Sequence, residues 1–179
     1  TYTATFPGAN TKATYLVSTA EALYAPVFEP VRQAANLDRR AQYLIISHPD
    51  FMDGIQPLVQ ARRAQGLTVN VVDVTALYAK YTYGVFDPQA IQKYIAYAAQ
   101  NLGTQYVLLV GGDTYDYRNY LGVNSLSFIP SLYARTGPIA SFVPADPLYA
   151  DVNKDNVPDV AIGRFPVRTV NELNLMVNK

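Results

Sequence analysis

Cysteine is absent from this chain of 179 residues, and tryptophan is absent as well. The lack of cysteine excludes disulfide bonds, thiolate zinc sites and a cysteine nucleophile from the segment, whatever its compartment. An excess of one charge is also lacking, because 14 basic residues balance 14 acidic ones and no run of lysine or arginine occurs. This balance gives no sign of a nucleic-acid partner or of an anionic membrane surface.

Long hydrophobic runs are missing too. No apolar stretch of roughly 18 residues, the length that spans a bilayer, occurs anywhere in the sequence. Thr1 opens no charged segment followed by an apolar one, as a secretion leader would. We therefore expect no membrane span, and any leader would lie upstream of Thr1.

Hydrophobic residues nevertheless make up 50% of the chain, so a packed core is expected and global disorder is not. The length fits one domain, or one large half of a bigger domain. Tyrosine is frequent, with 15 Tyr against 7 Phe. Surface tyrosines supply rigid contact area at interfaces, although half-buried positions at the edges of a core are the commoner explanation.

Four short apolar runs have the length and composition of buried strands. Helical patterns alternate with them, and this alternation predicts right-handed crossovers and a mostly parallel sheet with helices on both faces. The predicted fold class is therefore α/β, a three-layer sandwich of the flavodoxin-like kind. Ligands of such sheets bind at the carboxyl ends of the strands. The predicted strands cover residues 43–47, 67–74, 105–110 and 159–163.

Capping residues and helix breakers set the expected helix boundaries. Asp50 is predicted to cap a helix over residues 51–65, which Gly66 ends. Proline at the first turn of a helix loses no hydrogen bond, so Asp87-Pro88 is expected to start another helix. Further helical segments are predicted at residues 75–81 and from Thr169 onward.

The sequence predicts two parts of the chain, an N-terminal segment and an α/β subdomain. Residues 1–40 are expected to form an N-terminal strand, at 14–18, and a connector, while any helix over 21–37 should be short because prolines interrupt it. Residues 41–179 are expected to form the α/β subdomain. The sequence stops within the apolar face of the last predicted helix, so we expect this subdomain to be truncated at its C-terminus.

A long loop is predicted over residues 111–147, with one short strand near Phe128-Ile129. It contains Tyr115, Tyr117 and Tyr120, and Tyr133 follows them. Long structured loops are often functional. These tyrosines therefore either cover a second subdomain or line a cleft, or they pack as ordinary loop residues.

An acidic loop carries the main candidate for a metal site. Asp151, Asn153, Asp155, the carbonyl of Val157 and Asp159 fall at alternate positions, as in the first part of a calcium loop.

The later part of that pattern departs from an EF-hand. Asn156 replaces the expected glycine, and Ile162 stands where a bidentate glutamate would close the site. Asp146 is a candidate for a further oxygen ligand. The alternative is an Asx-rich turn whose carboxylates are solvated or paired to Arg164.

Two other motifs contain residues that are candidates for a functional site. Gly111-Gly112-Asp113 follows a buried strand, where glycines can expose amides to an anion, but a tight strand exit with Asp113 bonded to loop amides or to Arg164 is the commoner arrangement. His48 ends another strand. Its neighbour Ser47 should point to the opposite face, so a capping role is favoured over a Ser-His pair.

Several segments in this order and spacing resemble the gingipain family of cysteine peptidases. The resemblance runs over residues 14–179 and is carried by Tyr43-Leu-Ile-Ile-Ser-His-Pro-Asp-Phe51, Ala61-Arg-Arg-Ala-Gln-Gly-Leu-Thr-Val69, Tyr83-Gly-Val-Phe-Asp-Pro-Gln-Ala-Ile91, Tyr106-Val-Leu-Leu-Val-Gly-Gly-Asp-Thr-Tyr-Asp-Tyr117 and Pro158-Asp-Val-Ala-Ile-Gly-Arg164.

The resemblance implies a caspase-like catalytic domain made of two side-by-side subdomains, of which this chain supplies the first. In the family the catalytic His and Cys come later, from the second subdomain. Since no Cys is present and His48 lies outside that motif, no catalytic or cofactor-binding residue is assigned here, and the fragment alone is expected to be inactive. The resemblance also permits structural calcium and implies a secreted or cell-surface parent that acts on peptides or proteins.

Two alternatives remain open at this point. One is a non-catalytic, calcium-stabilised binding module of a pseudopeptidase surface protein. The other is a small-molecule binder of the flavodoxin type, which the lack of a phosphate-binding loop disfavours. The first would be favoured by a parent that lacks the His/Cys dyad, the second by a cofactor that copurifies.

Overall fold

A computed structural model describes residues 3, 5, 7–25, 37–138 and 140–179. The chain divides into two units, Thr1–Pro30 and Val31–Lys179. The described part of the first unit contains one short 3-10 helix, η1 (Ala20–Ala22). The strand expected at 14–18 is not formed, and its Leu16 is 94% exposed, because no neighbouring strand pairs with it. Most of the weak helix considered over 21–37 lies outside the described residues.

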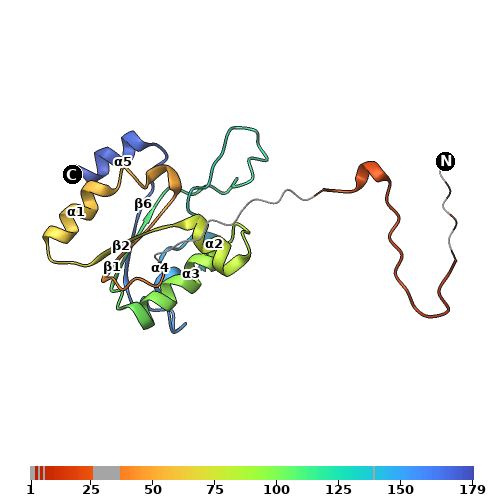
Figure 1. The fold of residues 1–179 in the computed structure, drawn as a ribbon, viewed down its shortest axis with the longest axis horizontal. Helices are drawn as coiled ribbons and strands as arrows, with labels where there is room; N and C mark the ends of the chain where they lie inside the picture. The colour runs from red at the N-terminus through yellow and green to blue at the C-terminus, as the bar shows by residue number, and fades with distance from the viewer. Residues whose placement is uncertain (1–2, 4, 6, 26–36, 139) are drawn as a thin grey trace. The chain divides into compact units, whose positions relative to one another are not determined.

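The second unit is built on a four-stranded parallel sheet (Figure 1). Its strand order is β2-β1-β3-β6, and every neighbouring pair is parallel. This confirms the α/β class with a mostly parallel sheet. The strands are β1 (Tyr43–Ser47), β2 (Val69–Asp73), β3 (Tyr106–Val110) and β6 (Ala161–Phe165).

Helices cover both faces of this sheet (Figure 1). One face packs against α1 (Gln56–Ala64) and α5 (Val170–Val177), through side chains such as Ile45, Val59 and Leu173. The opposite face packs against three helices through the alternate strand residues. These helices are α2 (Val74–Thr82), α3 (Pro88–Tyr97), which a π-helical segment η3 (Ala98–Leu102) prolongs, and α4 (Pro147–Ala150).

The first crossover helix starts later than the sequence suggested. A 3-10 helix, η2 (Pro49–Phe51), follows β1, and its cap is His48 rather than Asp50. The α-helix α1 begins only at Gln56, with proline in its first turn, where the missing N–H costs no hydrogen bond. The predicted helix over 51–65 was therefore too long at its start.

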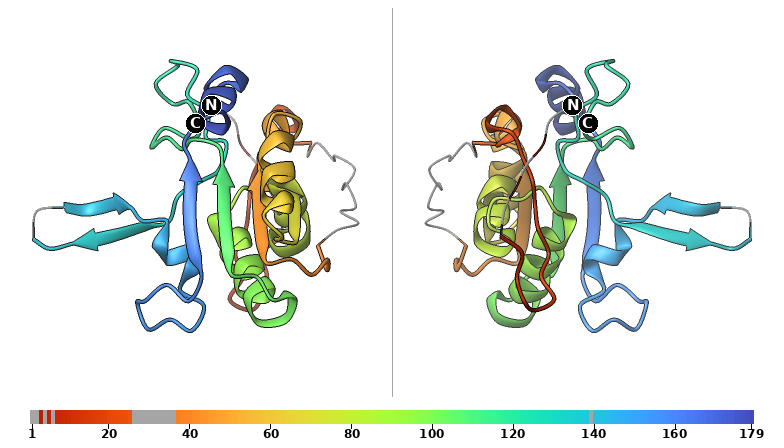
Figure 2. Two further views of the ribbon diagram at one scale, coloured as in Figure 1. Left: turned by 90° about the vertical axis from the view of Figure 1, so that its left-hand side faces the viewer. Right: turned by 90° about the vertical axis from the view of Figure 1, so that its right-hand side faces the viewer.

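The segment between β3 and α4 was also predicted incorrectly. Phe128 and Ile129 form no strand but are buried under Gly111. An antiparallel hairpin of β4 (Tyr133–Thr136) and β5 (Ala140–Pro144) lies further along instead. The hairpin projects away from the sheet beside β6 (Figure 2).

The last strand begins at Ala161, two residues later than predicted. Asp159 belongs to the preceding loop, because its carboxylate accepts hydrogen bonds from loop amides. The cap predicted for the final helix is confirmed, since the Thr169 hydroxyl accepts from the Glu172 amide. Among the described residues, no helix has the length and hydrophobicity that crossing a membrane requires.

Candidate functional site

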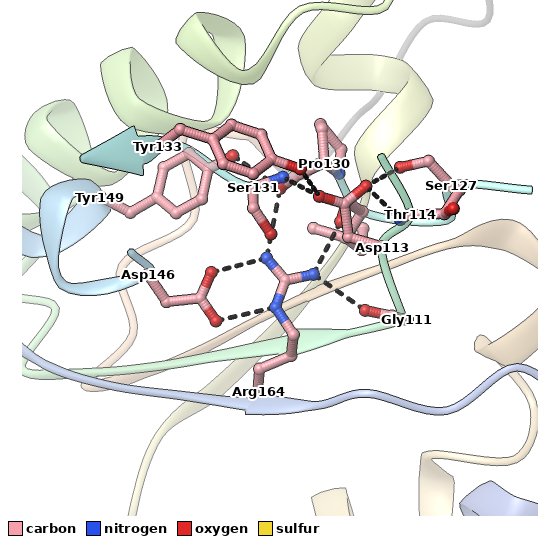
Figure 3. A network of polar contacts seen from close by, with 11 residues as sticks. Gly111, Asp113, Thr114, Ser127, Pro130, Ser131, Tyr133, Asp146, Tyr149 and Arg164 are labelled. Atoms are coloured by element: carbon pink, nitrogen blue, oxygen red, sulfur yellow. Dashed lines mark hydrogen bonds and ion pairs between the residues drawn. The ribbon is translucent and has the colours of Figure 1, made fainter. Parts of the chain in front are cut away.

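The carboxyl end of the sheet carries a polar network centred on Arg164 of β6 (Figure 3). Its Nε and Nη2 atoms donate to the two carboxylate oxygens of Asp146, at 2.8 and 2.7 Å. Such a bidentate pair is the strong, geometrically specific form of an arginine–carboxylate contact. The Arg164 side chain is only 10% exposed, so its charge is compensated almost entirely by this one partner.

The remaining donors of Arg164 reach the main chain of the β3–β6 connection. Nη1 donates to the carbonyl oxygens of Gly111 and Ile129, at 2.9 and 2.7 Å, and Nη2 to that of Pro130 at 3.2 Å. The buried Tyr149 hydroxyl donates to the same Pro130 carbonyl at 2.7 Å. Burial raises the pKa of Tyr149, so this hydroxyl stays a neutral donor. One guanidinium thus ties the exit of β3 to the segment at Ile129-Pro130.

Asp113 forms the second centre of the network (Figure 3). One of its carboxylate oxygens accepts from the Ser127 hydroxyl at 2.6 Å and from the amide of the adjacent Thr114 at 2.7 Å. The other accepts from the Ser131 amide at 2.8 Å and from the Tyr133 hydroxyl at 3.1 Å. The expected bonds from loop amides are therefore present, whereas Arg164 pairs with Asp146 instead.

The two glycines before Asp113 make a tight strand exit. Gly111 has φ +140°, and a Cβ there would lie 2.7 Å from the Cβ of Phe128, so a side chain does not fit. The Gly111 amide donates to the Phe165 carbonyl and the Gly112 amide to the Val167 carbonyl. Both amides are thus occupied within the fold and do not form an anion site.

A pocket of about 300 Å³ opens next to this network. The loop between α2 and α3 supplies Phe86 and Asp87, and the segment after β3 supplies Asp113 and Tyr117. Tyr133 closes another side. Tyr117 and Tyr133 therefore line a cleft, whereas Tyr120 is 75% exposed and lies outside the lining.

His48 has a structural role. Its Nδ1 accepts from the Asp50 amide at 3.3 Å, and its ring packs edge-on against Phe128, with ring centres 4.9 Å apart. Partial burial lowers the pKa of His48, while Asp50 and Asp73 oppose this shift. Ser47 donates to the carbonyl oxygen of His48, not to its ring. These contacts agree with the predicted capping role and do not form a Ser-His pair.

The acidic loop is held by hydrogen bonds from its own amides. Asp159 accepts from the amides of Val152 and Asn153, at 2.7 and 3.2 Å, and Asp151 accepts from those of Asp155 and Asn156. Further bonds run from the Asp155 amide to Asn153 and from the Val157 amide to Asp155. In the described part of the chain, no set of three or more acidic or histidine side chains is gathered as metal ligands. Calcium binding by this loop therefore stays a prediction.

Asp146, considered as a further calcium ligand, is instead the partner of Arg164. The sequence suggested Arg164 as a partner of the loop carboxylates or of Asp113 but did not single out Asp146, because the two residues stand 18 positions apart and only folding brings them together. A usable signal was the arginine directly after Gly163 in an otherwise apolar strand. A charge in such a strand needs a partner when it is buried.

The similarities of this chain to known proteins agree with the architecture described above. The sequence model of peptidase family C25 matches residues 36–179. No curated protein matches the chain.

Two solved structures are similar in fold. The crystal structure of dimeric latent PorU from Porphyromonas gingivalis has a TM-score of 0.64 and 21% sequence identity, over 77% of this chain and 15% of that one. A structure described as "Structure of Protease" has a TM-score of 0.53 and 14% identity, over 81% of this chain and 28% of that one. The present chain thus spans a small part of either protein. The family match covers well over half of the 179 residues, and the chain belongs to peptidase family C25, the gingipain family.

Proposed function

We propose that this chain is the first, scaffolding subdomain of a secreted or cell-surface cysteine endopeptidase of the gingipain type. The observation that carries the proposal is the family match over residues 36–179 in a sequence with no cysteine. A thiol nucleophile must then come from polypeptide outside these residues. Peptides or proteins are the proposed substrates of the whole enzyme.

The position of the only histidine supports the assignment of the catalytic groups to a second subdomain. A general base in cysteine peptidases has to lie within hydrogen-bond reach of the thiol and be free to take its proton. His48 instead accepts an amide hydrogen bond and packs on Phe128. We infer that the base, like the nucleophile, belongs to the part of the enzyme that follows Lys179.

The scaffolding role rests on the rigidity of the carboxyl end of the sheet. Catalytic groups supplied by a second subdomain need a fixed platform, because a misplacement of about 1 Å can lower the rate a hundredfold. Arg164 binds Asp146 and three carbonyl oxygens there, and Asp113 binds four donors. These contacts hold the β3–β6 connection in one conformation.

The test compares this chain with the same chain extended by the next two hundred codons of the parent gene. We expect no peptide hydrolysis by residues 1–179 alone, and thiol-dependent hydrolysis by the extended protein that iodoacetamide abolishes. Hydrolysis by the short chain would contradict the proposal. A parent without a downstream Cys and His would also contradict it and would favour the calcium-stabilised binding module.

A further inference from the structure

The pocket beside Asp113 has an unbalanced charge. Its lining includes Asp87 and Asp113 and no lysine, arginine or histidine. In the described residues the ion pairs are those of Asp38, Asp50 and Asp146, so neither pocket carboxylate has a cationic partner within 4.0 Å. Arg164 lies close by, but Asp146 already compensates it. A bound cation would supply the missing charge.

The hydrogen bonds of Asp113 restrict which cation fits. An ionised carboxylate has about four lone-pair positions, and Asp113 already accepts four hydrogen bonds. It keeps its negative charge but has no position left for another donor. Asp87 is also partly engaged, because it accepts from the Gln89 amide at 2.8 Å as the cap of α3.

The walls of the pocket are aromatic. Phe86 and Tyr117 stack with ring centres 6.1 Å apart and planes 11° from parallel, and Tyr133 stacks on Phe142 at 4.3 Å and 9°. The faces of such rings are negative and attract cations. The Arg118 guanidinium, 5.5 Å from the centre of the Tyr117 ring, illustrates this attraction outside the pocket lining.

Behind these walls lies a buried hydroxyl. Tyr78 is 6% exposed, its ring lies 5.3 Å from that of Phe86, and its hydroxyl has no hydrogen-bond partner. Burial raises the pKa of Tyr78, and the charge of Asp113 raises it further. The hydroxyl of Tyr78 therefore stays neutral, and at its position the charges of Asp113 and Asp87 are offset only in part, by Arg164.

From this combination we propose that the pocket binds a quaternary ammonium group, an organic cation without N–H donors. A primary ammonium or a guanidinium brings three or five donors, for which Asp113 has no acceptor left and Asp87 offers mainly the oxygen that does not cap α3. A methylated ammonium needs only negative charge and aromatic faces. The volume of about 300 Å³ suits a small head group. The proposal depends on this pocket alone and not on the proposed peptidase role.

Binding of tetramethylammonium chloride to the 179-residue chain tests the proposal by ligand-observed NMR. Ammonium and guanidinium chlorides serve as comparison cations, with sodium chloride holding the ionic strength constant. We expect saturable binding of tetramethylammonium, tighter than that of either comparison cation by about threefold or more. Absence of saturable binding, or equal or tighter binding of a cation with donors, would overturn the proposal.

A matched pair of variants locates the site. Asp87 and Asp73 each cap a helix through one carboxylate oxygen, but only Asp87 lines the pocket. Asparagine caps a helix about as well as aspartate, so Asp87→Asn removes the charge and keeps the fold. We expect Asp87→Asn to weaken tetramethylammonium binding about three- to tenfold and Asp73→Asn, whose charge acts more weakly there, to weaken it less. Equal effects of the two variants, or none from Asp87→Asn, would contradict the assignment.

Discussion

The side chain of Arg164 joins three separate segments of the chain at the carboxyl end of the sheet. Its partners lie in the exit of β3, the turn at Ile129-Pro130 and the start of α4. Asp146 is 24% exposed and Arg164 10%, so the pair lies largely out of water. Removing one member of such a pair leaves the other charge without compensation.

Replacement of Arg164 should therefore destabilise the protein strongly. For Arg164→Ala we expect a loss of about 3–5 kcal/mol in the free energy of unfolding, measured by urea denaturation. Lysine keeps the charge but lacks the planar fork that reaches several acceptors at once. Arg164→Lys should therefore recover only part of the loss.

The control for this experiment is Lys80→Ala. The Lys80–Asp38 pair is exposed, with 42% and 73% of the two side chains accessible, and its atoms lie 3.5 Å apart. Exposed pairs contribute about 0–1 kcal/mol. An Arg164→Ala variant no less stable than Lys80→Ala would show that the network does not hold the β3–β6 connection.

Among the secondary-structure elements, the buried strands were predictable and the hairpin was not. Residues 43–47 and 105–110 are almost continuously apolar, because both faces of these strands are covered by helices. The hairpin strands are largely exposed on both sides, so burial imposes no pattern on their sequence. Their pairing depends on neighbours that a local pattern does not reveal.

The candidate site was predictable only in part, for a similar reason. The exit at Gly111 and the involvement of Asp113 follow from their place after a buried strand. The contribution of Phe86 and Asp87 to the same pocket comes from a loop roughly 25 residues earlier, which only the packing of α2 against α3 brings near. Such contacts between distant segments leave no local signal in the sequence.

The acidic loop over residues 151–159 should respond to calcium. Binding only to the folded form stabilises it, by about 2.7 kcal/mol at a calcium concentration 100 times the dissociation constant. In a chain of this size we expect the melting temperature in calcium to exceed that in chelator by about 5–10 °C. Asp155→Ala should abolish this difference.

Two comparisons separate calcium binding from ordinary loop stability. In chelator, Asp155→Ala should lower the melting temperature only through the lost bond to the Val157 amide. Asp53 is also an exposed aspartate but lies outside the acidic loop, so Asp53→Ala should keep the full calcium response. An unchanged melting temperature in calcium, in the original chain as in Asp155→Ala, would rule the site out.

For the molecule as a whole, the buried tyrosines make the stability of the fold depend on alkaline pH. Burial raises the pKa of four of them strongly, to about 12 for Tyr133 and higher for the other three, with Asp113 adding to the shift of Tyr133; the pKa of Tyr81 is raised as well. The folded state therefore keeps these protons at a pH where the unfolded chain has lost them. The set consists of Tyr78, Tyr94, Tyr133 and Tyr149.

The sign of the resulting pH dependence follows by linkage. Stability from these groups is complete below about pH 10, the pKa of an unfolded tyrosine, and is lost as the pH rises toward the folded values. We expect the urea midpoint to fall between about pH 10 and 12, and a fraction of tyrosinate absorbance to appear only on unfolding. Tyr133→Phe should flatten the fall.

Tyr83→Phe provides the matched control, because Tyr83 is 98% exposed. It should leave the alkaline decline of the midpoint as in the original chain. If the urea midpoint of Tyr133→Phe falls as steeply with pH as that of Tyr83→Phe, the hydroxyl of Tyr133 titrates like one in water.

The place of Arg164 along the chain also bears on the order of assembly during synthesis. Every acceptor of its guanidinium precedes it, the earliest by 53 residues, so the ribosome has released all of them before the donor emerges. Until Arg164 is present, the connection after β3 has the hydrogen bonds of Asp113 but not those of the guanidinium, and the carboxylate of Asp146 lacks its cationic partner. A released chain that ends just short of position 164 should thus be cleaved by proteases within this stretch faster than the full 179 residues.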